Sequence, residues 1–242
     1  MENIPFVGAP RGDSFRKTIS VFTTKIRGAS KLTGEKLLDV GCGDGSFTIP
    51  LSKDYRHVLG IDVQENFLEV FRKKVAGDSK FQIVNMSAEK MSLDDASFDA
   101  IITIETIEHI PDLKKAAAEF HRVLKKGGEL IITCPNRLFP FENHGIRIGE
   151  KEYHTRIPLI TWLPRIHNRY SLARVFTVRA LDQLLCPLGF SRAYEDHIWP
   201  TFEHGGNIFS PVLRPLFGLM RVMEQSPLRM FGTSILVKYI KD

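Results

Sequence analysis

Short apolar runs alternate with amphipathic segments over the first 135 residues. Five runs are predicted as strands, at residues 36–40, 57–63, 81–85, 98–104 and 129–134. Segments with helical spacing precede or separate them, at residues 14–29, 46–53, 65–76 and 111–125, the last with Pro111 in its first turn and Gly127–Gly128 after its end. Strands that alternate with helices form βαβ units, so this part predicts a parallel sheet covered on both faces.

The alternation breaks after Pro135. Two long segments interrupted by prolines follow, residues 136–176 and 200–231. A helix with Thr177 as its N-cap is predicted over 177–185, and strands are predicted over 190–198 and 234–240. Long connections inside a compact domain are usually lids or binding loops. The pattern therefore predicts one α/β domain, residues 1–242, whose two insertions form a substrate cap.

A glycine-rich turn joins the first predicted strand to the next helix. Gly41, Gly43 and Gly45 follow Asp39 there, and glycine permits backbone conformations and close approaches that a Cβ forbids. The N–H groups at the start of the helix favour an anionic or polar ligand group. Asp62 ends the next strand, where a carboxylate can accept both hydroxyls of a ribose. The turn and Asp62 together predict a nucleoside-containing ligand.

The spacing of the glycines separates two classes of cofactor. The nicotinamide and flavin fingerprint G-x-G-x-x-G needs glycine where this chain has Ser46, which disfavours an oxidoreductase. The phrase LLDVGCGDGSF instead resembles motif I of the class I S-adenosylmethionine-dependent methyltransferases. Residues 60–68, 98–112, 124–136 and 231–240 resemble further motifs of that family in the same order. The resemblance implies a Rossmann-like sheet of seven strands, mostly parallel with the last strand antiparallel.

That resemblance also implies S-adenosylmethionine as the cofactor and gives roles to particular residues. It places Asp39 near the ammonium group of the cofactor, the glycines against its methionine end, and Asp62 on its ribose. The residues that it assigns to the cofactor are Asp39, Gly41, Gly43, Gly45, Asp62, Val63, Ser87, Ala88, Glu89 and Ile104.

Candidate catalytic residues follow the fourth predicted strand. Glu105, Glu108 and His109 fall on one face of a helical turn, and methylation of a hydroxyl requires a base. The pattern resembles ubiquinone-biosynthesis-type and RNA-terminal O-methyltransferases, in which such a cluster and a later histidine, here His144 or His154, hold a divalent ion. Related enzymes carry Glu-His without a metal, and a structural role for His109 stays open. We assign no metal and predict His109 and His144 as catalytic residues.

The charge of the chain is concentrated in its second part. The net charge is +5, and all of the excess lies after Pro135, where 11 of the 14 basic residues are arginines. Arginines alternate with aromatic residues between 136 and 170, an arrangement that stacks bases, binds an amphiphile with an anionic head, or forms a solvated lid. A charge of +5 is modest for nucleic-acid binding, so we do not expect a nucleic-acid partner.

The second insertion carries an apolar segment, residues 211–231, with a narrow polar stripe. Such a helix lies on a membrane surface, lines a lipid-sized pocket, or serves as a cap or dimer contact. No membrane-spanning run or secretory signal is apparent, and three cysteines without paired spacing indicate a reducing compartment. We therefore expect a cytoplasmic protein, peripheral to the membrane if residues 211–230 contact a bilayer. The oligomeric state is left open.

These observations predict a methyltransferase that acts on the oxygen of a small acceptor. The acceptor is expected to be amphiphilic or anionic, and lipid-linked if the apolar segment lines its pocket. Two alternatives stay open at this point: an RNA methyltransferase, and a non-catalytic protein that binds a nucleotide cofactor.

Overall fold

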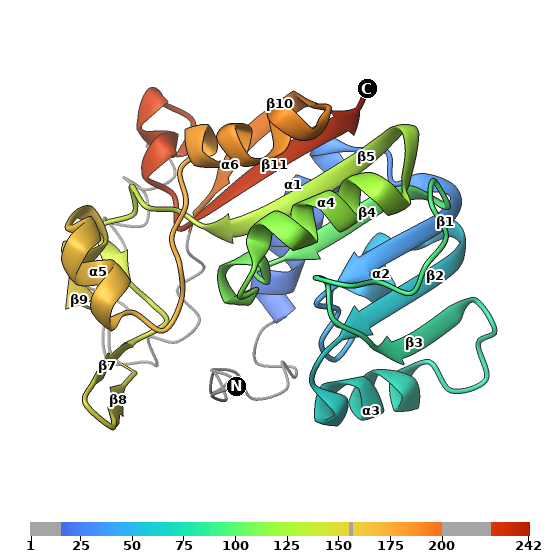
Figure 1. Ribbon diagram of the computed structural model, residues 1–242, viewed down its shortest axis with the longest axis horizontal. Helices are drawn as coiled ribbons and strands as arrows, with labels where there is room; N and C mark the ends of the chain where they lie inside the picture. Colours follow the sequence, from blue (N-terminus) through green and yellow to red (C-terminus); the bar gives the residue numbers. More distant parts are fainter. Residues whose placement is uncertain (1–15, 155–156, 200–223) are drawn as a thin grey trace.

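A single seven-stranded sheet forms the centre of the computed structural model, which describes residues 16–154, 157–199 and 224–242 (Figure 1). Its strands are β1 (Thr33–Val40), β2 (Asp54–Asp62), β3 (Phe81–Asn85), β4 (Phe98–Ile104), β5 (Leu124–Pro135), β10 (Phe190–Ile198) and β11 (Ser234–Lys241). Their order across the sheet is β10-β11-β5-β4-β1-β2-β3. The first five strands are parallel, and β11 runs antiparallel to both β5 and β10. This confirms the predicted topology.

Helices cover both faces of the sheet (Figure 1). They are α1 (Arg16–Ala29), α2 (Thr48–Leu51), α3 (Glu65–Lys74), α4 (Leu113–Val123) and α6 (Val178–Leu185). Ile26 of α1 and Leu51 of α2 are buried in one apolar cluster, whereas Phe120 of α4 and Leu181 of α6 are buried in another. Because both faces are covered, the central strands are apolar on both sides, which explains the continuous apolar runs in the sequence.

The helix predicted over 111–125 has different ends in the structure. Pro111 precedes it, and the Asp112 side chain caps it by accepting a hydrogen bond from the backbone N–H of Lys115 at 3.1 Å. The helix ends at Val123, and the Gly127–Gly128 pair lies inside β5. Leu124 already pairs with Phe98 of β4, so strand pairing, rather than the glycines, ends the helix.

The first insertion, residues 136–176, is called the cap insert below. It contains two small sheets, β6 (Phe141–Glu142) with β9 (Ile157–Pro158) and β7 (Ile146–Ile148) with β8 (Lys151–Tyr153), followed by η3 (Ile160–Trp162) and α5 (Pro164–Tyr170). Its two ends meet, because the N–H of Arg137 donates to the carbonyl of Phe176 at 2.8 Å. In Figure 1 it lies beside one end of the sheet.

Most of the second insertion lies outside the described residues. The structure describes its end, where η5 (Pro227–Phe231) is a short 3-10 helix. The helix predicted over 211–231 is therefore described only in this last part. None of the helices in the described ranges has the length and hydropathy needed to cross a bilayer.

Candidate active site

A cavity of about 230 Å³ lies at the carboxyl ends of the parallel strands, where ligands bind in open α/β sheets. Ten of the residues that the sequence assigned to the site line it: Gly41, Gly43, Asp62, Val63, Ser87, Ala88, Glu89, Ile104, His109 and His144. Asp39 and Gly45 do not line it. The fold thus brings together residues from four strand ends and from the cap insert.

The glycines of the turn are needed for two different physical reasons. Gly41 and Gly45 both have φ +76°, and a Cβ on either would lie 2.2 Å from a neighbour, Thr106 and Phe71 respectively. Gly43 also has a positive φ, +52°, but a Cβ there would meet nothing within 4 Å. Gly41 and Gly45 are therefore required for packing, whereas Gly43 keeps open a wall of the cavity.

Asp62 connects the end of β2 to the glycine turn. Its carboxylate accepts hydrogen bonds from the backbone N–H of Gly43 at 3.0 Å and of Gln64 at 2.9 Å. Burial raises the pKa of Asp62, and these bonds partly oppose the shift. Because each carboxylate oxygen can accept two hydrogen bonds, both oxygens can still accept from a ligand hydroxyl. This arrangement fits the predicted role on a ribose.

Asp39 lies behind the glycine turn, with 2% of its surface exposed. It accepts a hydrogen bond from the hydroxyl of Thr48 in α2 at 2.6 Å. Burial raises its pKa to about 7; the Thr48 bond opposes this shift and the charge of Asp62 adds to it. Asp39 thus holds the turn against α2, and its predicted contact with the ammonium group of the cofactor stays a prediction.

The loop after β3 also lines the cavity, through residues 86–89. The Ser87 hydroxyl accepts a hydrogen bond from the N–H of Glu89 at 3.2 Å, which fixes the turn between them. The Glu89 carboxylate accepts from the N–H of Asp112, the residue that caps α4. The loop whose residues the sequence analysis assigned to the cofactor is therefore connected to the loop that carries His109.

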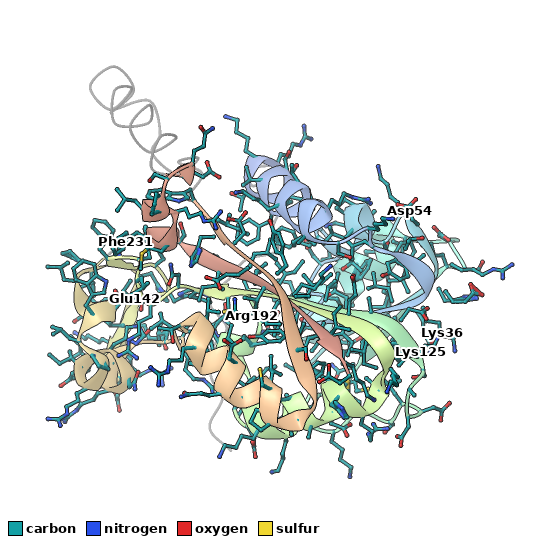
Figure 2. All side chains as sticks on the ribbon, turned by 90° about the horizontal axis from the view of Figure 1, so that it is seen from above. Lys36, Asp54, Lys125, Glu142, Arg192 and Phe231 are labelled. Carbon is teal, nitrogen blue, oxygen red and sulfur yellow. The ribbon has the colours of Figure 1, made fainter. Side chains whose placement is uncertain are left out.

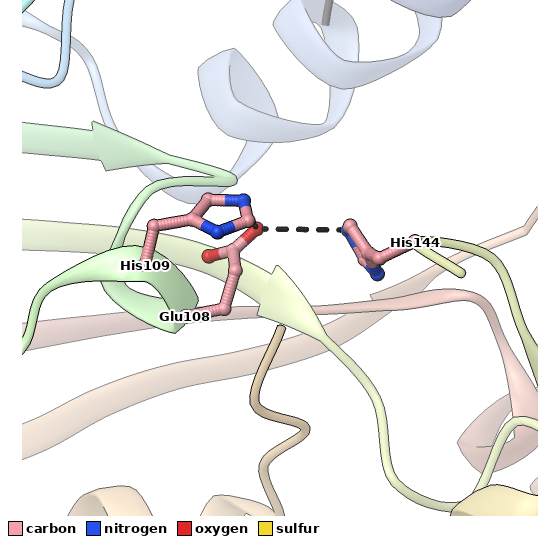
Figure 3. Close-up of side chains that lie close together, drawn as sticks. All are labelled: Glu108, His109 and His144. Carbon is pink, nitrogen blue, oxygen red and sulfur yellow. Dashed lines mark ion pairs between the residues drawn. The ribbon is translucent and has the colours of Figure 1, made fainter. Parts of the chain in front are cut away.

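His109 and His144 both line the cavity and lie next to each other, although they are 35 positions apart in the sequence (Figure 3). His109 ends η2 (Ile107–His109), the turn after β4, and the centroids of the two imidazole rings are 5.9 Å apart. An oxygen of the buried Glu108 carboxylate lies 3.9 Å from the Nε2 atom of each histidine. Glu105, just before this turn, has a φ of +49°, a strained conformation for a non-glycine residue.

His144 is held in place by Glu142, a residue that the sequence analysis did not single out. Glu142 is 1% exposed, and its carboxylate accepts hydrogen bonds from the N–H of His144 at 2.7 Å and from the hydroxyl of Ser171 at 3.0 Å. His167, also buried, contacts the same carboxylate. This buried carboxylate, labelled in Figure 2, thus connects two segments of the cap insert, the one that carries His144 and the one formed by α5 and Ser171.

The charges around His144 raise its pKa. Burial alone lowers the pKa, but the interaction with Glu142, whose oxygen lies 3.4 Å from Nδ1, and the charge of Glu108 together more than offset that effect. The same histidine bonds hold the pKa of Glu142 well below its usual range, although burial opposes them. His144 is thus a stronger base than an isolated histidine.

Three side chains here have the chemistry and spacing of metal ligands. The ligand atoms of Glu108, His109 and His144 all lie within 4.8 Å of one another. His154, the other histidine considered as a ligand, is half exposed and does not line the cavity. Its Nε2 atom lies 3.5 Å from a carboxylate oxygen of Glu152. The same three groups are equally placed to bind a substrate hydroxyl and remove its proton.

The cavity is lined by acidic groups. Asp44, Asp62, Glu89, Glu105 and Glu108 line it, and none of the described lining residues is lysine or arginine. A wall of this kind favours a ligand with positive charge, such as a sulfonium and an ammonium group, and disfavours a pyrophosphate. The residues therefore fit S-adenosylmethionine, which has both cationic groups and a ribose, better than a dinucleotide.

Comparison with known sequences agrees with this geometry. Residues 38–132 match the family model described as "Methyltransferase domain". A demethylmenaquinone methyltransferase of Clavibacter sepedonicus is 34% identical over 106 residues, and one of Staphylococcus epidermidis is 40% identical over 101 residues. These matches cover 44% and 40% of this chain, and 43% and 42% of the relatives. The chain thus matches less than half the length of these relatives.

Solved structures extend the similarity over nearly the whole chain. A methyltransferase from Mesorhizobium loti, described as dependent on S-adenosylmethionine, has a TM-score of 0.63 at 18% identity, covering 95% of this chain and 99% of its own. A protein from Listeria monocytogenes, described as a putative methyltransferase of the same kind, has a TM-score of 0.66 at 16% identity, with coverages of 93% and 98%. Residues 38–132 are thus similar to a methyltransferase domain, and the chain has the fold that is seen in class I S-adenosylmethionine-dependent methyltransferases.

Proposed function

We propose that this protein transfers a methyl group from S-adenosylmethionine to a hydroxyl oxygen of a small amphiphilic acceptor. One observation carries the proposal: the His109–His144 pair faces the same acid-lined cavity as the glycine turn and Asp62. Groups that can bind the cofactor and candidate bases therefore line one cavity, which a methyl transfer needs and a simple binding protein does not.

The residues have distinct parts in this reaction. When bound, S-adenosylmethionine would supply the methyl group from a positively charged sulfur, whose bond to the methyl carbon would break to leave a neutral thioether. Asp62 and the turn at Gly43 orient the cofactor, and His144 removes the proton of the acceptor hydroxyl. Glu142 stabilises the imidazolium that results, because its carboxylate lies beside Nδ1. The proton thus moves from the acceptor oxygen to His144, while the oxygen gains the methyl group.

The lining of the cavity narrows the class of acceptor. Acidic side chains repel an anionic head group, so the lining favours a neutral hydroxyl over the anionic acceptor that the arginines had suggested. Apolar residues, among them Phe47, Phe67 and Met86, complete the wall and favour an aromatic or aliphatic body. The relatives named demethylmenaquinone methyltransferase support an aromatic ring with an apolar tail. We therefore propose a quinol-like hydroxyl compound.

The test uses the purified chain and cofactor labelled in its methyl group. Naphthoquinols with short isoprenoid tails serve as acceptors, and mass spectrometry locates the methyl group on oxygen or carbon. The proposal predicts a labelled methyl ether, formed by the wild type and lost in His144→Gln. Label on ring carbon would contradict the hydroxyl acceptor, and label in RNA with steep salt dependence would favour an RNA methyltransferase. Cofactor binding without turnover on any acceptor would favour a non-catalytic role.

A further inference from the structure

Exposed apolar side chains gather on the cap insert. Leu159, Trp162, Leu163 and Ile166 each expose between 45% and 51% of their surface. They lie close together in the chain, from Leu159 just before η3 to Ile166 in the first turn of α5. Of the other exposed large apolar residues that the structure describes, Phe141, Ile148 and Tyr153 also lie in the cap insert, Leu228 and Met230 lie in η5, and Val63 lines the cavity. Grouped exposure of this kind marks an interaction surface.

The positive charge of the same segment indicates an anionic partner. Arg165 and Arg169 are exposed on α5 between and beyond the apolar residues. The sequence from residue 153 to 181 contains no aspartate or glutamate, whereas it contains five arginines. Apolar side chains next to arginines complement a surface that is both hydrophobic and negatively charged. An anionic lipid bilayer has these two properties.

Trp162 has an arrangement that suits a membrane interface, with its polar N–H bonded and part of its ring exposed. Its indole N–H donates to the carbonyl of Leu138 at 3.0 Å, so the polar edge of the ring is satisfied within the protein. The rest of the side chain stays half exposed. Tryptophan held in this way can bury its ring at the head-group level without losing a hydrogen bond.

The opposite side of this segment is anchored at the active site. His167 of α5 is buried and contacts Glu142, the carboxylate that also holds His144 in the cavity. The exposed apolar side chains and the contact with Glu142 thus belong to one short segment, which is connected to the cavity through Glu142 and His144. An acceptor with an apolar tail can leave the bilayer next to the cavity that receives its ring.

We propose that residues 159–170 form a docking face that binds the surface of an anionic lipid bilayer. The occupant is the lipid surface itself, bound by shallow insertion of the apolar side chains and by the two arginines. This face is distinct from residues 211–230, whose expected membrane contact stays a prediction because residues 200–223 lie outside the described part. The inference deepens the proposed function, because it says how a lipid-linked acceptor reaches the cavity.

Vesicle binding tests this face without any need for turnover. The full chain is mixed with phosphatidylcholine vesicles, with or without phosphatidylglycerol, and separated by flotation. We expect binding to the anionic vesicles only, reduced at least about tenfold by Leu163→Gln with Ile166→Gln and by Arg165→Glu with Arg169→Glu. The matched control, Lys53→Glu with Lys126→Glu, makes the same charge change at exposed positions near the amino ends of β2 and β5. It should retain wild-type binding.

A spectroscopic measurement locates the contact. The chain has two tryptophans, so Trp162 is the sole reporter in a Trp199→Phe background. Its emission should shift to the blue when anionic vesicles are added, and melting temperature and cofactor affinity should be unchanged in the docking-face variants. Vesicle binding that survives these variants, or an unshifted Trp162 emission, overturns the proposal. So does a dimer in sedimentation that Leu163→Gln with Ile166→Gln converts to monomer.

The outcome is distinguishable from failure of the proposed function. A water-soluble acceptor without an apolar tail needs no bilayer, so its methylation should be the same in the wild type and in the docking-face variants. If no acceptor is methylated at all, vesicle binding and the Trp162 shift still decide whether the face exists.

Discussion

Two regions of the molecule meet at the cavity and differ in how they are built. The sheet region, residues 33–135, supplies the glycine turn, Asp62 and His109, and most of it matches the methyltransferase family model. The cap insert supplies His144 and lies beyond that match, which ends at residue 132. The first 135 residues carry no net charge, whereas the rest of the chain carries the whole excess of +5.

The difference lies in what fixes each functional group. In the sheet region, parallel strand pairing and backbone hydrogen bonds place the ligand groups, as when Asp62 accepts from two backbone N–H groups. In the cap insert, strands of two or three residues add little, and the buried carboxylate of Glu142 organises the contacts. We infer that cofactor binding is built into the fold, whereas acceptor chemistry depends on a few polar contacts in the cap insert.

The largest expected effect is the loss of turnover when a catalytic residue of the cap insert is replaced. His144→Gln should lower the rate of methyl transfer by about 10²–10⁴, the usual contribution of a general base, with cofactor affinity unchanged. Single-turnover kinetics and calorimetry measure the two quantities. His154→Gln is the matched control, because His154 lies in the same insert but outside the cavity lining. Repeating the assay in EDTA sharpens the result: activity that EDTA removes and a divalent ion restores would make His144 a metal ligand instead.

On the sheet side, the largest effect is expected on stability. Gly45→Ala should lower the free energy of unfolding by about 2–4 kcal/mol, because it combines a left-handed backbone with a clash against Phe71. Gly43→Ala, in open space, should cost only about 1–2 kcal/mol but should weaken cofactor binding, since its methyl group enters the cavity. Urea unfolding with calorimetry compares them, and equal losses of stability would contradict the distinction.

Asp62→Ala should weaken cofactor binding by about 10–100-fold, through loss of charge-assisted hydrogen bonds worth about 1.5–3 kcal/mol. Asp54→Ala is the control on the same strand, since Asp54 begins β2 and its side chain forms an exposed ion pair with Arg27. Isothermal titration calorimetry gives both affinities. An Asp62 variant that binds the cofactor as the wild type does would remove Asp62 from the ribose site.

Replacing Glu142 in the cap insert is expected to change how the rate of methyl transfer depends on pH. The methyl transfer requires neutral His144, whose pKa is raised above its ordinary value by Glu142 and Glu108. Glu142→Gln removes one of these charges, so the rising limb of the pH–rate profile should move to lower pH. A limb that stays in place would show that Glu142 supports only the structure of the cap insert.

Much of the sheet region could be predicted from sequence because its signals are local. The bounds of β3 and β4 agree with the prediction, and so does the Thr177 cap of α6, whose hydroxyl accepts from the N–H of Ala180 at 3.2 Å. The end of α4 could not be predicted from local signals. Whether residues 124–128 are helix or strand is decided by pairing with β4, a contact between distant segments.

The same reasoning explains which site residues were missed. Glycine spacing and strand-end acids have known roles, so the cofactor side could be assigned by motif. Glu142 gave no such signal, because its burial depends on His167, 25 residues later, and its short strand has no periodicity. An acid two residues before a candidate catalytic histidine is the signal that could have found it. Thr106 was missed likewise, and it explains why residue 41 must be glycine.

The smallest expected effect is on the number of protons released when the cofactor binds. This number tests the predicted contact between Asp39 and the ammonium group of the cofactor. Burial raises the pKa of Asp39 to about 7, so near neutral pH a large share of molecules carry its proton. A cofactor ammonium group beside the carboxylate would favour the charged form and release less than one proton on binding. Calorimetry at pH 7 in buffers of different ionisation enthalpy measures this release, which should vanish in Asp39→Asn.

Stability supplies the second half of that test. A carboxyl group whose pKa is raised in the folded state stabilises the fold fully at pH below about 4, its unfolded pKa, and loses that contribution as pH rises through about 7. The wild type should therefore lose up to about 2 kcal/mol between pH 5 and 7, a loss that Asp39→Asn should lack. If that loss of stability appears without proton release on binding, Asp39 supports the glycine turn alone. Cofactor recognition would then depend on groups that line the cavity. In the sheet region, Asp39 would have a structural role and Asp62 would bind the ligand.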